Sequence, residues 1–120
     1  MEVRKLDQFI ISDVKALDSL LSDFYNIIKV GPKAVTGDAE RIVFVMKRNI
    51  ATVLRENNPS EDLILELLSE LRSAYYSMFH SKGGLSEFYI WDDNFEIRKK
   101  KNMEYEQIKS MIERILNMKR

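Results

Sequence analysis

Residues 64–79 read ILELLSELRSAYYSMF, the most apolar helical pattern in the chain. Apolar side chains recur here in steps of three and four residues, which places them on one face of an α-helix. This face consists of Ile64, Leu67, Leu68, Leu71, Tyr75, Met78 and Phe79. Because this helix is the most apolar one, we expect it to lie at the centre of the fold.

Start and stop signals bound this helix. The break NNPSED, residues 57–62, contains Ser60 as a good N-cap, and the two acidic residues after Ser60 complement the helix dipole. The helix is expected to close at His80. Gly83 or Gly84 then supplies the left-handed residue that commonly follows a helix C-terminus.

Two helical segments precede this one. Residues 3–28 predict one long helix, or two collinear helices separated near Ser12, and the Gly31-Pro32 pair ends them because glycine tolerates a left-handed turn and proline cannot continue the ladder. Thr36 or Asp38 is expected to cap the next helix. The apolar face of that helix consists of Ala39, Ile42, Val43, Met46, Ile50, Val53 and Leu54.

A last helix follows an aromatic stretch. Asp93 and Glu96 have the spacing of a capping box, which predicts a start near residue 94, and Asn102 offers an alternative start. The expected inner face consists of Tyr105, Ile108, Met111, Ile112, Ile115 and Met118.

Four amphipathic helices with short connections in 120 residues predict a single all-α domain over residues 1–120. The expected fold is an antiparallel four-helix bundle with an aromatic loop segment between the third and fourth helices. Strands have little support, because only residues 85–91 have strand-like content and a lone strand has no partner.

Composition excludes several kinds of chemistry. The chain has no cysteine, which rules out disulfides, thiolate catalysis and cysteine-bound metals. Its formal net charge is zero, which argues against a general polyanion binder. No signal-peptide pattern and no membrane-length apolar run are seen, so a cytoplasmic protein that does not enter the membrane is the expectation.

The charges are unevenly spread. Residues 56–93 carry a net charge of −6 and residues 94–120 a net charge of +4, which predicts an acidic helix beside a basic one. The basic cluster RKKK, residues 98–101, lies partly on an apolar stripe. Either the helix start projects past the bundle, or the charged side chains extend along an apolar edge. The cluster could dock onto the acidic face of the third helix or bind phosphate.

No catalytic, cofactor-binding or metal-binding residue is predicted. The single histidine, His80, is expected to be an exposed residue at a helix end. Asp62, Glu66 and Glu70 share one helix face, but the Glu-x-x-His motifs of di-metal bundles are missing. These carboxylates are therefore expected to form a solvated face.

The stretch KGGLSEFYIWDDNFE, residues 82–96, contains four of the twelve aromatic residues of the chain. In an extended conformation, Phe88 and Ile90 would point one way and Tyr89 and Trp91 the other; a helical turn would instead align Leu85 with Phe88. The segment either plugs one end of the bundle or anchors a partner protein. The predicted partner-binding residues are Glu87, Tyr89, Trp91 and Asp92, and the neighbouring acids Glu87, Asp92 and Asp93 would form a polar rim.

The stretch LRSAYYSMFHSKGGLSEFYIW, residues 71–91, resembles small uncharacterised bacterial helical domains. In these domains a helix rich in Leu and Tyr or Arg leads through a glycine turn of the Gly-Gly-Leu-Ser-Glu-Phe type into an apolar run and a charged last helix. The resemblance covers the C-terminal half and implies no catalytic residue. Small bacterial proteins of this build are also similar to immunity proteins that pair with toxins.

These observations together predict a non-enzymatic protein that binds another protein, as an immunity-type or regulatory partner. Self-association into a homodimer is a further expectation open to such a bundle. The alternative is a nucleic-acid-binding or enzymatic helical domain that uses the cluster at 98–101. Nucleic acid is the less favoured partner, because the cluster has no interleaved stacking platform in the sequence.

Overall fold

The computed structural model describes residues 2–80 and 84–118, and the side chains of residues 2–10 and of Glu87 are not among those described. The elements are α1 (Glu2–Ile28), α2 (Lys33–Leu54), α3 (Glu61–His80), a short 3₁₀ turn η1 (Leu85–Glu87) and α4 (Phe95–Leu116). The described residues contain no strand. The all-α four-helix bundle predicted from the sequence is confirmed.

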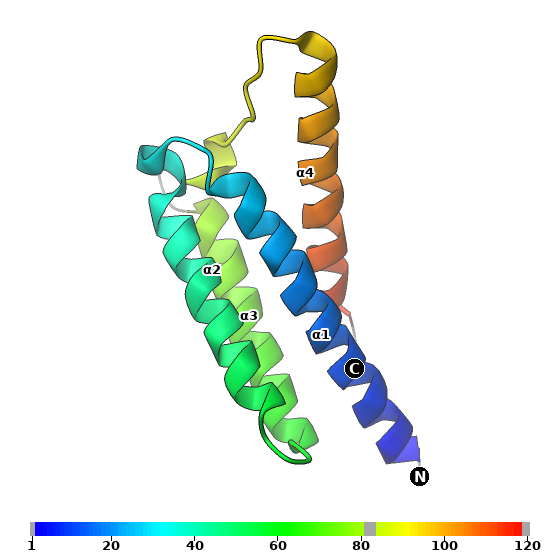
Figure 1. Cartoon of the computed structure of the whole chain (residues 1–120). Coiled ribbons are helices and arrows are strands. Elements are labelled where there is room, and N and C mark those ends of the chain that lie inside the picture. The colour runs from blue at the N-terminus through cyan, green and yellow to red at the C-terminus, as the bar shows by residue number, and fades with distance from the viewer. Residues whose placement is uncertain (1, 81–83, 119–120) are drawn as a thin grey trace.

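In Figure 1 each helix runs in the direction opposite to the one before it. Helices α1 and α3 contact each other and also both α2 and α4, whereas α2 and α4 make no contact within the described residues. The centre is therefore shared by α1 and α3, rather than formed by α3 alone.

The core is built from the inner faces of all four helices. The predicted face of α3 is buried from Ile64 to Met78, and Phe79 at its end is partly buried. The ring of Phe24 on α1 lies 6.2 Å from that of Tyr75 on α3 and 5.8 Å from that of Tyr105 on α4. Aromatic contacts at these distances hold three helices at one level of the bundle.

Polar contacts join the last turns of α4 to α3. The Tyr75 hydroxyl donates to Oε2 of Glu113 at 2.8 Å, and Nε of Arg72 donates to the Leu116 carbonyl at 2.8 Å. Burial, and then the hydrogen bond to Glu113, raise the pKa of Tyr75. Arg72 satisfies a carbonyl that the end of α4 would otherwise leave unpaired.

The connection between α1 and α2 differs in detail from the prediction. Helix α1 is continuous, and α2 begins at Lys33, directly after Pro32. Thr36 and Asp38 are therefore not N-caps; the Thr36 hydroxyl is buried and donates to the Pro32 carbonyl. Gly31 does not adopt a left-handed conformation. It is needed because a Cβ atom there would lie 2.6 Å from Cε1 of Phe88.

The helices α3 and α4 start close to where the sequence predicted, but only the predicted cap of α3 is confirmed, and the predicted Asp93 cap of α4 is wrong. The amide of Leu63 donates to Oγ of Ser60 at 3.1 Å, which confirms the predicted cap. Asn94 rather than Asp93 caps α4, through a bond from the Ile97 amide.

Other predicted details are wrong or lie outside the described residues. Gly84 has a φ of −89° and is not left-handed, and Gly83 is outside the described residues. Asn102 does not start a helix but lies inside α4. Met111 and Met118, expected in the core, are exposed.

Replacing Leu67 with alanine is expected to lower the free energy of unfolding by about 2–5 kcal/mol, because a buried side chain is lost and a cavity remains. Leu63 lies on the same helix but is exposed. The matched Leu63→Ala variant should therefore cost less than about 1 kcal/mol. Urea unfolding measures both changes, and equal losses would show that the Leu67 face is not buried.

Candidate binding surface

Figure 1 shows that α4 begins beyond the ends of the other helices. The segment that leads from η1 to α4 extends past the end of the bundle to reach this start. Residues 95–104 are exposed or half-buried, and Tyr105 is the first buried residue of the helix. The sequence left two explanations for the charged residues on the apolar stripe of the last helix. The structure supports the first explanation, in which the start of that helix projects past the bundle.

The inner side of the segment closes the end of the bundle. Leu85 is buried, and Phe88 and Ile90 are half-buried against the core. The Phe88 ring packs edge-on against Tyr105, with 5.1 Å between ring centres. The predicted inward direction of Phe88 and Ile90 is confirmed, and Phe88 itself has extended backbone angles.

The outer side of the segment faces solvent. The exposed fraction is 57% for Tyr89 and 67% for Trp91, and it is 61% for Phe95 at the start of α4. Tyr89 and Trp91 thus lie at the surface, as the alternation predicted. We call Tyr89, Trp91, Phe95 and Arg98 the aromatic surface.

Of the three predicted rim acids, Asp92 and Asp93 can be placed, and Asp93 is exposed. The Oδ1 atom of Asp92 accepts a hydrogen bond from the Asn94 amide at 2.9 Å, and its Oδ2 lies 3.5 Å from Nζ of Lys101. Asp92 therefore orders the turn into α4 and is half-buried rather than fully open to a partner. The side chain of Glu87 lies outside those described.

Arg98 organises the aromatic surface. Its guanidinium lies 4.4 Å from the ring centre of Trp91 and 5.4 Å from that of Phe95. Trp91 is also held by its indole N–H, which donates to Asp93 at 3.2 Å. The predicted site omitted Phe95 and Arg98. Their spacing of three residues, which puts them on one helix face, was the available signal.

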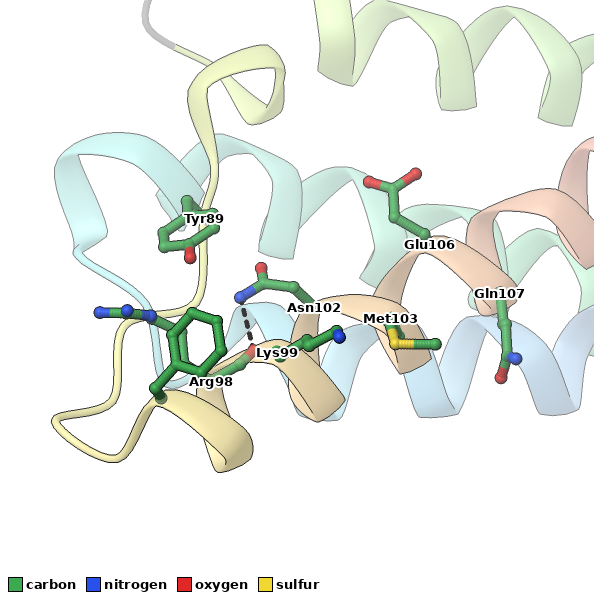
Figure 2. A pocket seen from close by; sticks show the side chains of 8 residues that line it. Tyr89, Arg98, Lys99, Asn102, Met103, Glu106 and Gln107 are labelled. Atoms are coloured by element: carbon green, nitrogen blue, oxygen red, sulfur yellow. Dashed lines mark hydrogen bonds between the residues drawn. The ribbon is translucent and has the colours of Figure 1, made fainter.

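Asn102 holds the segment to α4. Its side-chain oxygen accepts from the Ile90 amide at 3.0 Å, and its side-chain nitrogen donates to the Ile90 carbonyl at 2.9 Å. The same nitrogen donates to the Arg98 carbonyl, the bond drawn in Figure 2. One amide thus satisfies both backbone groups of Ile90, as a neighbouring strand would.

A groove of about 500 Å³ lies along this face of α4. Figure 2 shows Tyr89 from the segment on one side, with Asn102, Met103 and Glu106 following one another along the helix. Phe95 and Lys99 also line the groove. Such a groove, mostly apolar with a few polar groups, can receive a large side chain of a partner.

The basic cluster does not dock onto the acidic face of α3. Arg98 is stacked on aromatic rings and Lys101 pairs with Asp92, while Lys99 and Lys100 are exposed and have no partner among the described side chains. The cluster lies at the projecting start of α4 and so beyond the end of α3. Ion pairs between the two are therefore out of reach.

The other polar residues named from the sequence lie on α3. His80 is exposed at the end of α3, as predicted, and Asp62, Glu66 and Glu70 are exposed. Within the described residues, no three His, Cys, Asp or Glu side chains are placed to share a metal ion. Among the side chains that the structure describes, none forms a hydrogen bond with the buried Tyr105 hydroxyl. Burial is the largest cause of the raised pKa of Tyr105.

Comparisons with known proteins give no information about this surface. No protein-family model, curated protein or solved structure matches the chain. None of the helices in the described part of the chain has the length and hydropathy needed to cross a bilayer.

Replacing Asn102 with leucine keeps the size of the side chain but removes both hydrogen bonds to Ile90. Because each bond contributes about 0.5–1.5 kcal/mol, hydrogen exchange at the Ile90 amide should accelerate about tenfold or more. Gln107→Leu is the control, since Gln107 lines the same groove without a hydrogen bond to the segment. Wild-type exchange in the Asn102 variant would mean that other contacts hold the segment.

Proposed function

We propose that this chain is a non-enzymatic protein that binds another protein through the aromatic surface. The observation that carries the proposal is the exposed stack of Trp91, Arg98 and Phe95 at the projecting end of the bundle. Trp, Tyr and Arg are the residue types that most often dominate binding energy at protein interfaces. Because Arg98 and Asp93 already orient Trp91, little side-chain entropy is lost on binding.

The proposed partner-binding residues are Glu87, Tyr89, Trp91 and Asp92, extended by Phe95 and Arg98. Tyr89 stands at the groove beside α4, where an apolar side chain of the partner would insert. Asp92 lies at the edge of the proposed binding surface, where its ion pair with Lys101 helps to hold the turn into α4. This arrangement has the apolar centre and charged rim of a protein interface.

The concrete role we propose is that of an immunity-type or regulatory partner in the bacterial cytoplasm. A small bundle with one preordered surface suits a protein that acts by covering part of another. The similarity of the C-terminal half to small bacterial helical domains supports this role, and the absence of cysteine is compatible with a reducing compartment.

One observation favours nucleic acid as the rival partner. Exposed aromatic rings beside Arg98 and Lys99 are the combination that single-stranded nucleic acids bind. However, residues 89–107 contain five acidic and four basic side chains. A surface with this balance would repel phosphates about as much as attract them, so we favour a protein partner.

Replacing Trp91 with alanine is expected to change the free energy of unfolding by less than about 1 kcal/mol, because the side chain is mostly exposed. Partner binding should weaken by about 2 kcal/mol or more. The partner is first captured with the immobilised wild-type protein, and its affinity is then measured by calorimetry.

Phe44→Ala is the matched control, since Phe44 is an equally exposed aromatic residue on α2. This variant should bind the captured partner with wild-type affinity. If Trp91→Ala also binds normally, or if it unfolds the protein, the aromatic surface is not a binding site.

Labelled single-stranded DNA or RNA is expected not to bind at physiological salt. The comparison is between the wild type and a variant with Lys99, Lys100 and Lys101 all changed to glutamine. Wild-type binding that weakens steeply with salt, and that the variant loses, would support the nucleic-acid alternative instead. Filter binding over a salt series makes this measurement.

A further inference from the structure

The side chain of Arg98 is held in place by aromatic rings, but its hydrogen-bond donors are unused. Its guanidinium lies 4.4 Å from the ring centre of Trp91 and 5.4 Å from that of Phe95, and the residue is half-buried. Within the described residues, this guanidinium has neither a hydrogen-bond acceptor nor an acidic partner. Contacts with ring faces leave the N–H groups of the cation available to another molecule.

Two cations that line the groove, Arg98 and Lys99, have no counter-ion within the described part of the chain. They are consecutive residues in the first turns of α4. Figure 2 shows Tyr89 and Arg98 at one end of the groove and Gln107 at the other. Because Arg98 is half-buried, less water screens its charge, and it attracts an anion more strongly than a fully solvated side chain would.

The described acidic side chains near these cations are bound to other groups or lie outside the groove. Asp92 is paired within the turn into α4, and Asp93 accepts the indole N–H of Trp91 at 3.2 Å. Farther along the helix, Glu106 lies 3.4 Å from Nζ of Lys109. Two more acids line only a neighbouring hollow of α4: Glu96 and Glu104. The positive charge at Arg98 and Lys99 is therefore not balanced locally.

The groove beside these cations suits an apolar side chain. Tyr89, Phe95 and Met103 supply apolar surface, and the volume of about 500 Å³ is large enough for one large side chain. The side-chain nitrogen of Asn102 already donates to the carbonyls of Ile90 and Arg98, so both of its N–H groups are used. The surface thus combines an apolar groove with an unpaired positive charge at one end.

We propose that the partner segment carries an acidic side chain that binds Arg98 and Lys99, next to a large apolar side chain that fills the groove. This inference rests on the proposed function, because it names the chemistry of the partner at the same surface. A planar guanidinium can donate two parallel N–H bonds to one carboxylate. Arg98 itself lines the groove, and residues of an extended chain advance about 3.3 Å each, so neighbouring positions supply both side chains.

The carboxylate is assigned to an aspartate or glutamate side chain rather than to a chain terminus. Arg98 lines the groove and also contacts Trp91, which does not line it. A segment that covers both must continue past Arg98, whereas a terminus bound there would leave Trp91 uncovered. A nucleic-acid strand fits less well, because its repeated phosphates would also approach Glu104 and Glu106 farther along α4.

Three short peptides test the inference in NMR titrations of the full chain. The probe is acetyl-Gly-Leu-Glu-Gly-amide, and the neutral control has glutamine in place of glutamate. Acetyl-Gly-Gly-Leu with a free carboxylate tests a chain terminus as the ligand. The chain has a single tryptophan, so the indole N–H signal of Trp91 reports on the aromatic surface without ambiguity.

The glutamate peptide should shift the Trp91 signal with an affinity about fivefold or more above that of the glutamine peptide, because only glutamate adds a charge-assisted pair. Equal affinities, or no shift by either peptide up to about 10 mM, overturn the inference. Tighter binding of the free-terminus peptide would assign the site to a chain terminus instead. A shift caused by oligo-dT but not by the glutamate peptide would assign it to nucleic acid.

Arg98→Gln and Lys100→Gln are matched variants, because each removes one positive charge from the same region of α4 but Lys100 does not line the groove. Arg98→Gln should lower the affinity ratio of the glutamate and glutamine peptides to about one, whereas Lys100→Gln should keep it. A disturbed Trp91 would weaken both peptides alike and leave the ratio unchanged. Amide spectra confirm that both variants are folded, and loss of the ratio in both contradicts a specific contact at Arg98.

Failure of this inference is distinguishable from failure of the proposed function. If binding of the captured partner depends on Trp91 but the peptides show no preference for glutamate, the aromatic surface binds a protein without the carboxylate contact. If Trp91→Ala leaves partner binding intact, the proposed function itself fails. The captured partner gives a final check, since Arg98→Gln should weaken its binding about fivefold or more and Lys100→Gln should not. Equal effects of the two variants on the partner overturn the inference.

Discussion

Phe24 is fully buried in α1, and its ring meets Tyr75 of α3 and Tyr105 of α4. This contact fixes the position of α4 along the axis of the bundle. Tyr105 is well inside α4, so the turns before it must extend beyond the other helices. The projecting helix start, the segment that climbs to reach it and the exposed aromatic side chains all follow from this one level of aromatic packing.

The segment between α3 and α4 both closes the bundle and forms a surface. A lone extended segment leaves backbone groups unpaired, and Asn102 pairs both groups of Ile90. Phe88 packs between Tyr105 and the turn at Gly31, where no side chain would fit. With its inner side so fixed, the segment presents Tyr89 and Trp91 outward without needing a partner to order them.

In α4, the periodicity of the sequence did not correctly predict which apolar residues are buried. Its apolar residues form a stripe wide enough to include Met111, yet α1 and α3 cover only the part that contains Tyr105, Ile112 and Leu116. A helix period reveals that a face is apolar, whereas burial depends on which neighbours reach that face. The prediction that Met111 and Met118 are buried was wrong because they lie on the side of α4 that the bundle leaves uncovered.

The sequence by itself determined the four helices, the cap at Ser60 and the opposite directions of Phe88 and Trp91. These features follow from short-range periodicity and from hydrogen bonds between residues close in the chain. Only the tertiary structure decided that Arg98 stacks on Trp91, that Asn102 clamps Ile90 and that the basic cluster lies beyond the acidic face of α3. Each of these depends on where α4 lies relative to its neighbours, and that position is set by packing between distant residues such as Phe24 and Tyr105, which no local pattern encodes.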